Sequence, residues 1–473
     1  MLPTYFKKQT VRRFFFFLNM SSSSVLRPHN TTEYGIVKIV PPRGWNPPSP
    51  FTRIDVKKPF ATYRQNVDQL NSLSDSKITD GLFYTANSYR KMALKFENEW
   101  RHNHPSIRTS DQVEEAFLKI ISERKPKLIV EYGANLSPKI IGSGFSMNKE
   151  KPDPTLGKFA QWNLNTIGYK PEGSLLGLEC DGNISGITLP WLYFGMMFAN
   201  FSTHVEDNHL FSINYMHQGS PKTWYGVPPA AADDFDNVCE EIYGKSRSLL
   251  RKLNFFEPPN TFLKRSVQIV HALQEAGTFI VTCPRAYHGG FSHGFNIGEA
   301  VNFATLEWIP RGIACRNLYH SPKHSKDPYR HSVFNVDSLF RKIGQYLVNK
   351  GPEFVKANCE VKIVKQLRDH IKQLSDEDRG ARTLLQQKGV AEMELSGPVD
   401  DEEHRECKFC KASAFTAVLI CSCQPDKTVC LKHYDKLCAH CTPRQMMVLM
   451  WERPCVLDTL VSKLDRLIEV VSK

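Results

Sequence analysis

The chain has 473 residues, of which 41% are hydrophobic and 11% aromatic, so it can bury a sizeable core and is globular rather than disordered. Lys and Arg outnumber Asp and Glu by 61 to 49, a formal net charge of +12, which suits acidic partners such as nucleic acid. No internal repeat is visible, which excludes solenoid and propeller folds.

The N-terminal residues 1–32 are predicted to form a disordered basic arm. Their longest apolar run, residues 14–18, is too short to span a membrane or to act as the core of a secretory signal. A mitochondrial presequence is the alternative interpretation, and Met20 is a second candidate start. The basic residues that flank the run are Lys7, Lys8, Arg12 and Arg13.

A short strand at residues 34–40 runs into a proline-rich extended segment that ends at Pro48. Such a segment cannot fold alone, so residues 33–60 are expected to pack on a larger domain. Residues 61–125 are predicted to be a helical linker, because residues 86–123 are rich in Lys, Glu, Arg and Leu.

Residues 126–325 are predicted to form a β core. From Lys127 to Tyr132, and again from Ile187 to Phe303, β-branched and aromatic residues run in short stretches that Gly and Pro interrupt. Many short strands of this kind indicate a β-sandwich or barrel. Helical spacing of the apolar residues returns in residues 326–390, where it indicates core packing.

The C-terminal part divides into an acidic linker at residues 391–406, a cysteine-rich segment at residues 407–451 and a helix at residues 452–473, which is expected to pack on that segment. Seven of the thirteen cysteines lie in the cysteine-rich segment, and such clustering favours metal binding over disulfides. Their paired spacing, with one histidine, supplies enough soft ligands for two tetrahedral zinc sites. In chain order these ligands are Cys407, Cys410, Cys421, Cys423, Cys430, His433, Cys438 and Cys441.

His204 and Glu206 stand two residues apart in a strand-like stretch, so both side chains point to one face. An imidazole and a carboxylate placed in this way, joined by a distant histidine, form a facial triad that leaves positions on Fe(II) open for a co-substrate and O₂. His288 is the candidate third ligand, because it follows an apolar strand and precedes two glycines that allow a close backbone approach.

Polar groups downstream of this pair suit a dicarboxylate. Ser212 and Asn214 alternate on one face of a strand, and Lys222 precedes the aromatic Trp224. An ammonium is a compact countercharge for a carboxylate, while hydroxyl and amide groups add directed hydrogen bonds. Arg285 is an alternative base for the same carboxylate.

Six segments resemble, in order, the Jumonji N and C domains of the JARID-type (JmjN/JmjC) histone lysine demethylases, and the cysteine-rich segment resembles the five-Cys/His/two-Cys zinc finger that follows them. The likeness covers residues 34–451, with residues 33–60 as a shortened JmjN-like segment and residues 126–325 as the JmjC oxygenase core. It implies a mainly β fold with α-helices, namely a double-stranded β-helix (the cupin-like jelly roll) with helical flanks and a small zinc module. The segments are Tyr34–Pro48, Val130–Ala134, Gly142–Phe145, Trp162–Asn165, Pro190–Met196 and Glu299–Phe303.

The resemblance also implies roles for individual residues, with 2-oxoglutarate as co-substrate. The implied iron ligands are His204, Glu206 and His288. Tyr132 and Lys222 would bind the distal carboxylate of 2-oxoglutarate, and its pocket would be lined by Phe201, Ser212, Asn214 and Trp224. The residues that would flank the methylated side chain are Tyr193 and Asn302. Thr203 and Ser292 depart from the family, which usually carries tryptophan and asparagine at these positions.

In the finger, a cross-braced arrangement would use the eight ligands in two sets. One zinc would be held by Cys407, Cys410, Cys430 and His433, and the other by Cys421, Cys423, Cys438 and Cys441. The spacing alone leaves this pairing open, with His440 as a less favoured substitute ligand.

The activity implied is that of a nuclear Fe(II)- and 2-oxoglutarate-dependent demethylase that oxidises N-methyl groups of histone H3 and releases formaldehyde, succinate and CO₂. Trp191 and Ala300, together with the finger, favour the lysine at position 4 of that tail over positions 9 and 36. The implied partners are a methylated histone tail or nucleosome, chromatin complexes and DNA bound without sequence preference, and no membrane. Two alternatives stay open: a catalytically silent Jumonji chromatin adaptor, and a protein hydroxylase that uses the same cofactors.

Overall fold

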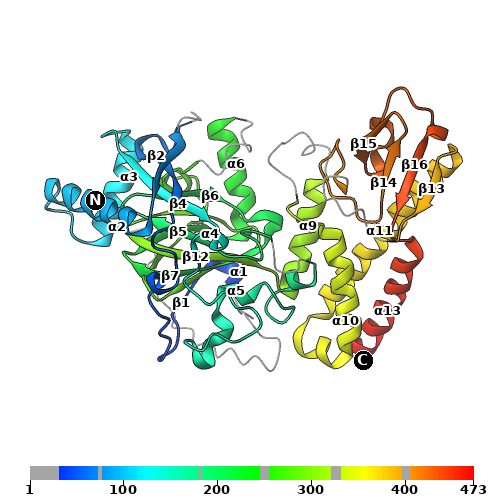
Figure 1. Cartoon of the computed structure of the whole chain (residues 1–473), viewed down its shortest axis with the longest axis horizontal. Helices are drawn as coiled ribbons and strands as arrows, with labels where there is room; N and C mark the ends of the chain where they lie inside the picture. Colours follow the sequence, from blue (N-terminus) through cyan, green and yellow to red (C-terminus); the bar gives the residue numbers. More distant parts are fainter. Residues whose placement is uncertain (1–30, 73–76, 180–183, 245–254, 321–331, 397–404) are drawn as a thin grey trace. The chain divides into compact units, whose positions relative to one another are not determined.

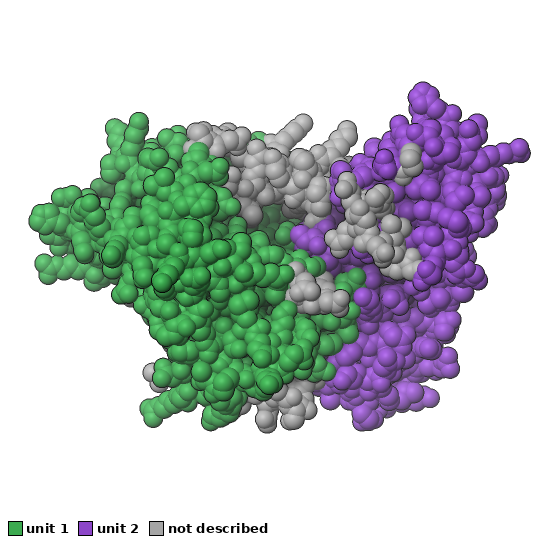
Figure 2. Space-filling view, viewed as in Figure 1, with its two compact units in different colours: residues 1–19, 25–303 green, residues 20–24, 304–473 purple. Residues whose placement is uncertain are grey.

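The computed structural model describes residues 31–72, 77–179, 184–244, 255–320, 332–396 and 405–473 (Figure 1). Most of the predicted basic arm and the acidic stretch of the predicted linker, residues 397–403, lie outside these described residues. The described chain forms two compact units, one that ends at Phe303 and one that runs from Ala304 to Lys473 (Figure 2). None of the described helices is long and apolar enough to cross a membrane.

Two antiparallel sheets form the core of the first unit, and their side chains meet between them. The larger sheet has eight strands in the order β1-β10-β7-β12-β5-β4-β2-β3, and the smaller has four in the order β6-β11-β8-β9. The expected cupin-like β core is confirmed. The strands are β1 Ile36–Ile39, β2 Phe60–Asn66, β3 Ile78–Tyr84, β4 Ile129–Leu136, β5 Trp191–Gly195, β6 Asn200–His204, β7 Phe211–Gly219, β8 Lys222–Val227, β9 Val270–Gln274, β10 Phe279–Thr282, β11 Tyr287–Ser292 and β12 Asn296–Phe303.

Two helices, α2 (Ala86–Asn103) and α3 (Ser110–Glu123), cover one side of this core (Figure 1). Each begins at a threonine whose side chain accepts a hydrogen bond from the backbone of the third helical residue, which satisfies an otherwise unpaired N–H group. Their apolar faces join the same buried cluster as Phe194 and Phe291. The shorter helices of this unit are α1 Thr31–Tyr34, α4 Pro138–Ile141, α5 Leu164–Ile167, α6 Ala232–Tyr243 and α8 Pro259–Leu263.

The interpretation of residues 61–125 as a helical linker was wrong for their first part. Strands β2 and β3 extend the larger sheet instead, and β2 pairs with β4 so that Tyr63 lies opposite Tyr132. Strand β3 has no buried residue, and β2 buries only Phe60, Thr62 and Gln65. Neither strand therefore shows a continuous buried apolar run, and pairing within the sheet decides their conformation.

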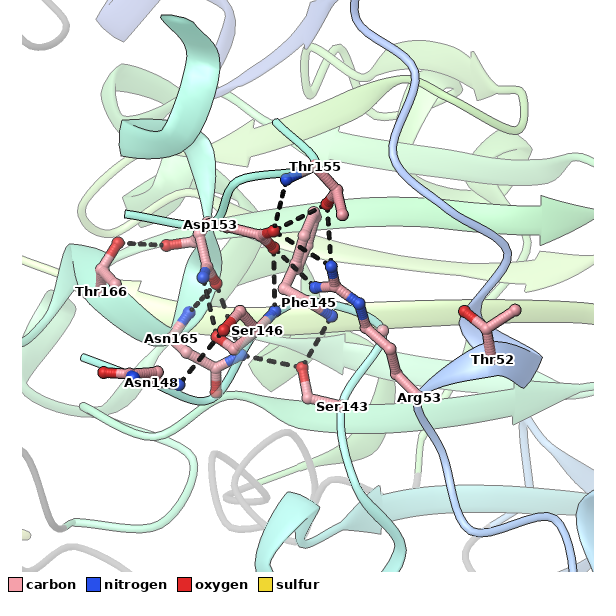
Figure 3. Close-up of polar contacts among 12 residues, drawn as sticks. Thr52, Arg53, Ser143, Phe145, Ser146, Asn148, Asp153, Thr155, Asn165 and Thr166 are labelled. Atoms are coloured by element: carbon pink, nitrogen blue, oxygen red, sulfur yellow. Dashed lines mark hydrogen bonds and ion pairs between the residues drawn. The ribbon is translucent and has the colours of Figure 1, made fainter. Parts of the chain in front are cut away.

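The N-terminal segment adds an edge strand and an aromatic anchor to the first unit. Strand β1 pairs with β10, and the ring of Trp45 then packs edge-on against Tyr215, whose hydroxyl accepts a hydrogen bond from Trp45 Nε1 at 3.0 Å. Further along, the guanidinium of Arg53 donates two hydrogen bonds to the carboxylate of Asp153 (Figure 3). Residues 33–60 therefore pack along the β core.

Asp153 is the centre of a polar network that fixes the loop after α4 (Figure 3). Its carboxylate also accepts hydrogen bonds from the backbone N–H groups of Ser146 and Thr155. Burial alone would raise the pKa of Asp153, but these bonds and Arg53 hold that pKa well below its usual range. In the same loop, Ser143 donates a hydrogen bond to Glu299 of β12, which ties the loop to the sheet.

The second unit combines a helical layer with a small four-stranded sheet. The helices are α9 Ile309–Tyr319, α10 Val336–Asn358, α11 Val361–Gln387 and α13 Pro454–Ser472. The strands are β13 Ala391–Glu394, β14 Ala417–Cys421, β15 Gln424–Val429 and β16 Met446–Met450, in the order β13-β16-β14-β15. Helix α9 belongs to this unit, so the predicted boundary of the β core at residue 325 lies too far along the chain.

Two expectations about the second unit were wrong. The predicted linker begins with a strand, because β13 pairs in parallel with β16. The C-terminal helix α13 packs on α10 and α11 rather than on the cysteine-rich segment. Its buried leucines Leu460 and Leu464 face Gly344 of α10, where the absence of a side chain allows the helices to approach closely.

A buried ion pair joins α9 to α10. Arg316 donates hydrogen bonds to both carboxylate oxygens of Asp337, and His370 of α11 lies 3.5 Å from the same carboxylate. Both members of the pair are buried. Removing one partner would leave an uncompensated charge inside the helical layer.

We therefore expect Asp337→Ala to lower the free energy of unfolding of the second unit by about 3 kcal/mol, because the buried Arg316 would lose its hydrogen-bonded carboxylate and keep only the more distant Glu377, at 3.8 Å. Chemical denaturation followed by circular dichroism measures this change. Asp369→Ala, which removes an exposed carboxylate of α11, is the matched control and should shift the free energy by less than about 1 kcal/mol. Equal effects of the two variants would contradict the assignment.

Candidate metal and co-substrate site

Strand pairing brings the three predicted iron ligands together. Strand β6 ends at His204, and Glu206 follows two residues later. Strand β11 lies beside β6 in such a register that His288 is directly opposite His204. The ligand atoms of His204, Glu206 and His288 all lie within 4.8 Å of one another, so a single ion could contact all three.

Backbone carbonyls orient both imidazole rings. His204 Nδ1 lies 2.7 Å from the carbonyl oxygen of Ser202, and His288 Nδ1 lies 2.9 Å from that of Ala286. Because a carbonyl oxygen only accepts hydrogen bonds, each Nδ1 carries the proton and each Nε2 keeps a lone pair. The Nε2 atom of His288 lies 3.3 Å from Glu206 Oε1, so the lone pairs point to the centre of the triad.

Electrostatics keep His204 and Glu206 in the protonation states that a metal needs. Burial, assisted by the neighbouring His288, lowers the pKa of His204 to about 4. Burial alone would raise the pKa of Glu206, but hydrogen bonding and the nearby histidines lower that pKa to about 2. Near neutral pH, His204 is therefore a neutral imidazole and Glu206 a carboxylate, as metal ligation requires.

Asn302 of β12 holds the carboxylate of Glu206. Its side-chain amide donates a hydrogen bond to Glu206 Oε2 at 2.9 Å and another to the carbonyl oxygen of Phe211 at 3.1 Å. These contacts would orient Glu206 as a metal ligand; the expectation that Asn302 also flanks the methylated side chain stays a prediction. Tyr193, the other residue expected near the substrate, lies on β5 with its ring 6.3 Å from that of Tyr132.

Lys222 is a buried ammonium group that lacks a countercharge. Its Nζ atom lies 5.4 Å from the ring centre of Phe201 and 5.9 Å from that of Tyr193, and no carboxylate of the described residues forms a salt bridge with it. Burial lowers the pKa of Lys222 to about 8. Because an unpaired buried charge is costly, this pocket suits an anionic ligand. The nearby Tyr132 stays a neutral hydrogen-bond donor, since burial raises its pKa.

The remaining predicted pocket residues lie near Lys222 and the triad. The rings of Phe201 and Trp224 lie 4.6 Å apart, and Trp224 is 6.1 Å from the ring of His288. Asn214 donates a hydrogen bond to Ser212 at 3.0 Å. Ser212 lies directly opposite Asn302, the hydrogen-bond partner of Glu206, so these two side chains share a face of the sheet.

Sequence reasoning missed two residues that hold predicted pocket residues in place. Thr282 shares a hydrogen bond of 2.6 Å with Ser212, its cross-strand partner, and Gln274 accepts one of 2.9 Å from Trp224 Nε1. Neither residue lies near its partner in the sequence, so only strand pairing could have identified it. Arg285, the alternative base for the dicarboxylate, pairs with Asp233 of α6 instead, and that alternative is not supported.

The two departures from the family pattern lie in different settings. The backbone N–H of Thr203 donates a hydrogen bond to the carbonyl oxygen of Phe255 at 2.9 Å. Ser292 lies directly across from Lys222 on β8 and β11, so the two side chains share a face. The buried hydroxyl of Ser292 has no hydrogen-bond partner within the described residues, which leaves a polar atom available on the face that carries Lys222.

The cysteine-rich segment places its eight predicted ligands in two clusters. Cys407, Cys410, Cys430 and His433 form one, and Cys421, Cys423, Cys438 and Cys441 form the other, each with ligand atoms within 4.8 Å of one another. The side chain of His440 joins neither cluster, although its backbone N–H donates to Cys438 Sγ at 3.3 Å. None of the cysteines in the described residues forms a disulfide. Both clusters have the ligand chemistry of structural zinc sites.

Comparison with known proteins agrees with this geometry. Residues 191–303 match the family model of the JmjC domain, hydroxylase, and residues 407–460 match that of the C5HC2 zinc finger. The chain is 34% identical over 393 residues to lysine-specific demethylase 5D of Homo sapiens and, over the same length, to that of Pan troglodytes. It is 32% identical over 366 residues to lysine-specific demethylase 5B of Gallus gallus. These matches cover 81%, 81% and 75% of this chain but 24%, 24% and 23% of the relatives, so the chain spans about a quarter of their length.

The charge of Lys222 makes ligand binding depend on pH. Its pKa of about 8 means that the free protein loses the ammonium charge as the pH rises through this value, so the affinity for 2-oxoglutarate should fall above it. Lys222→Met should weaken binding by roughly a hundredfold at lower pH and remove the pH dependence. Calorimetric titration of Mn²⁺-loaded protein at several pH values measures both effects.

Lys91→Met, which alters an exposed lysine of α2, serves as the control and should bind like the unaltered protein. If Lys222→Met bound 2-oxoglutarate with unchanged affinity, another group would have to hold the distal carboxylate.

Proposed function

The chain carries a JmjC domain at residues 191–303 and a C5HC2 zinc finger at residues 407–460, and on that premise we propose that it is an Fe(II)- and 2-oxoglutarate-dependent histone lysine demethylase. The observation that carries the proposal is the convergence of His204, Glu206 and His288 in the same β core as the buried ammonium of Lys222, which forms no salt bridge within the described part of the chain. This combination supplies ligands for a divalent metal and a countercharge for a dicarboxylate.

Each residue of the site has a task in this proposal. Iron with 2-oxoglutarate and O₂ would supply the oxidation of an N-methyl group, which leaves as formaldehyde while 2-oxoglutarate becomes succinate and CO₂. His204 and His288 present Nε2 to the metal, and Asn302 keeps the carboxylate of Glu206 aimed at it. Lys222 and Tyr132 bind the distal carboxylate of 2-oxoglutarate, and the neighbouring aromatic rings exclude water.

The substrate that we propose is the methylated lysine at position 4 of the histone H3 tail, with Tyr193 beside the methylated side chain. Trp191 and Ala300, which suggested this position in the sequence, are cross-strand neighbours on β5 and β12. The Trp191 indole donates a hydrogen bond to Ser185 at 2.7 Å, so it is held at the beginning of the strand that carries Tyr193. We further propose that the chain acts in the nucleus, on nucleosomes and together with chromatin complexes.

A catalytically silent adaptor is disfavoured by the intact triad, since all three ligands lie within reach of one ion. A protein hydroxylase with the same cofactors would use the same metal site. The two activities differ in their products, because a hydroxylase leaves a stable hydroxylated side chain and releases no formaldehyde.

We predict that the purified chain, supplied with Fe(II), 2-oxoglutarate and O₂, removes methyl groups from an H3 peptide methylated at position 4 in preference to peptides methylated at positions 9 or 36. Mass spectrometry of the peptides and a formaldehyde assay follow the reaction. His204→Ala and Glu206→Ala should reduce formaldehyde release to background while the fold persists, because the triad loses a ligand. His102→Ala, which alters an exposed histidine of α2, should retain full activity.

Undiminished formaldehyde release by either triad variant would remove these residues from the metal site. A peptide that gains oxygen without losing a methyl group would identify the hydroxylase instead.

For the finger, we propose two structural zinc ions per chain, one in each cluster. We expect elemental analysis to find both in the purified protein and Cys430→Ser to lose one of them. Because the binding of structural zinc contributes about 10–16 kcal/mol to the folding of such modules, loss of a ligand should unfold the segment around β14 and β15 and make it sensitive to proteolysis. Cys455→Ser, which changes an exposed cysteine of α13, should keep both ions.

A further inference from the structure

The turn between β10 and β11 has Arg285 at its third position, in an unusual backbone conformation. The backbone N–H of Ala286 donates to the carbonyl oxygen of Cys283 at 3.0 Å, with Pro284 and Arg285 between them. Arg285 has a φ of 64°, a conformation that turns of this kind usually assign to glycine because other side chains are strained there. Strain of this sort persists only where surrounding contacts over-determine the backbone.

Contacts with α6 supply that constraint. The guanidinium of Arg285 donates two hydrogen bonds to the carboxylate of Asp233 and lies 3.9 Å from that of Asp236. The hydroxyl of Tyr287, two residues along the chain, donates to Asp236 at 2.6 Å. Helix α6 therefore holds the turn through two side chains that flank Ala286.

The opposite side of the turn is also fixed. The backbone N–H of Cys283 donates to the carbonyl oxygen of Gly35 at 2.8 Å. Gly35 has a φ of 76°, and a Cβ atom there would lie 3.0 Å from the Cβ of Ala286. The turn thus has little freedom to rotate, because both Gly35, the residue before β1, and helix α6 confine it.

Ala286 connects this turn to the metal triad, because its carbonyl oxygen accepts the hydrogen bond from His288 Nδ1 at 2.9 Å. That carbonyl belongs to the peptide unit between Ala286 and Tyr287, so its direction follows the backbone of Ala286, which the contacts of Arg285 and Tyr287 with α6 hold on both sides. A rotation of the turn would tilt the imidazole ring and move its Nε2 atom away from the other ligands.

We propose that Arg285 is a positioning residue for His288: by pairing with Asp233 and Asp236 it locks the strained turn that aims the imidazole at the metal. This inference rests on the proposed metal site. It predicts that Arg285 affects the affinity for the metal but not the affinity for 2-oxoglutarate. The sequence had instead offered Arg285 as an alternative base for the 2-oxoglutarate carboxylate.

The test is Mn²⁺ binding to the zinc-loaded full chain, followed by the electron paramagnetic resonance signal of the free ion. Mn²⁺ suits imidazole and carboxylate ligands, whereas the thiolate clusters select zinc. Arg285→Ala should weaken Mn²⁺ binding by about tenfold or more, the usual effect of removing an outer partner of a metal ligand. Arg285→Lys keeps the charge and should recover part of the loss, and 2-oxoglutarate affinity in Mn²⁺-saturated Arg285→Ala should stay unchanged.

Two further variants separate this role from general destabilisation. Asp233→Asn removes the partner on the exposed side of α6 without altering the turn itself, so it should weaken Mn²⁺ binding even if Arg285→Ala folds poorly. Arg265→Ala breaks another ion pair of the same helix, with Glu241, and should leave Mn²⁺ binding unchanged.

Unchanged Mn²⁺ affinity in Arg285→Ala or, should that variant not fold, in Asp233→Asn overturns the inference. If Mn²⁺ affinity fell in these variants but not in His204→Ala, this result would instead overturn the proposed metal site, and the inference with it.

Discussion

The register between β6 and β11 is the constraint on which the site depends. It sets His204 opposite His288. The Nδ1–H group of each ring donates a hydrogen bond to a backbone carbonyl oxygen, that of Ser202 for His204 and that of Ala286 for His288. A shift of one residue would turn every side chain of a strand to the other face, so the pairing and the hydrogen bonds together decide whether a metal can be held. Asn302, from the larger sheet, then fixes Glu206.

The second constraint is the charge of Lys222, which the core buries without a countercharge from any residue that the structure describes. Isolated buried charges are costly, yet this position on β8 faces Ser292 and lies among aromatic rings. A bound dicarboxylate would offset the cost of burying the Lys222 charge. Stability and function therefore compete at Lys222, as they do at Arg285, where a side chain occupies a backbone conformation that favours glycine.

The two compact units are stabilised by different means. The first has a continuous apolar cluster that spans the sheets and helices α2 and α3, so its fold does not require a metal. The small sheet of the second unit has a core that includes three of its own metal ligands, Cys407, Cys410 and Cys421. Removing the metal there would bring thiolates together without a cation, so metal binding and folding are coupled in that segment.

Patterns local in the sequence determined much of this protein. The spacing of His204 and Glu206, the paired cysteines and the runs of short apolar strands depend only on neighbouring residues. They predicted candidate ligands and the β core, whereas the division of the cysteines into two sets came from the family resemblance. Tertiary structure alone decided that β2, β3 and β13 are strands, that α13 packs on α10 and α11, and that Arg285 pairs with α6. These features depend on contacts between residues far apart in the chain, and no local pattern specifies which distant partner a strand, a helix face or a charged side chain will meet.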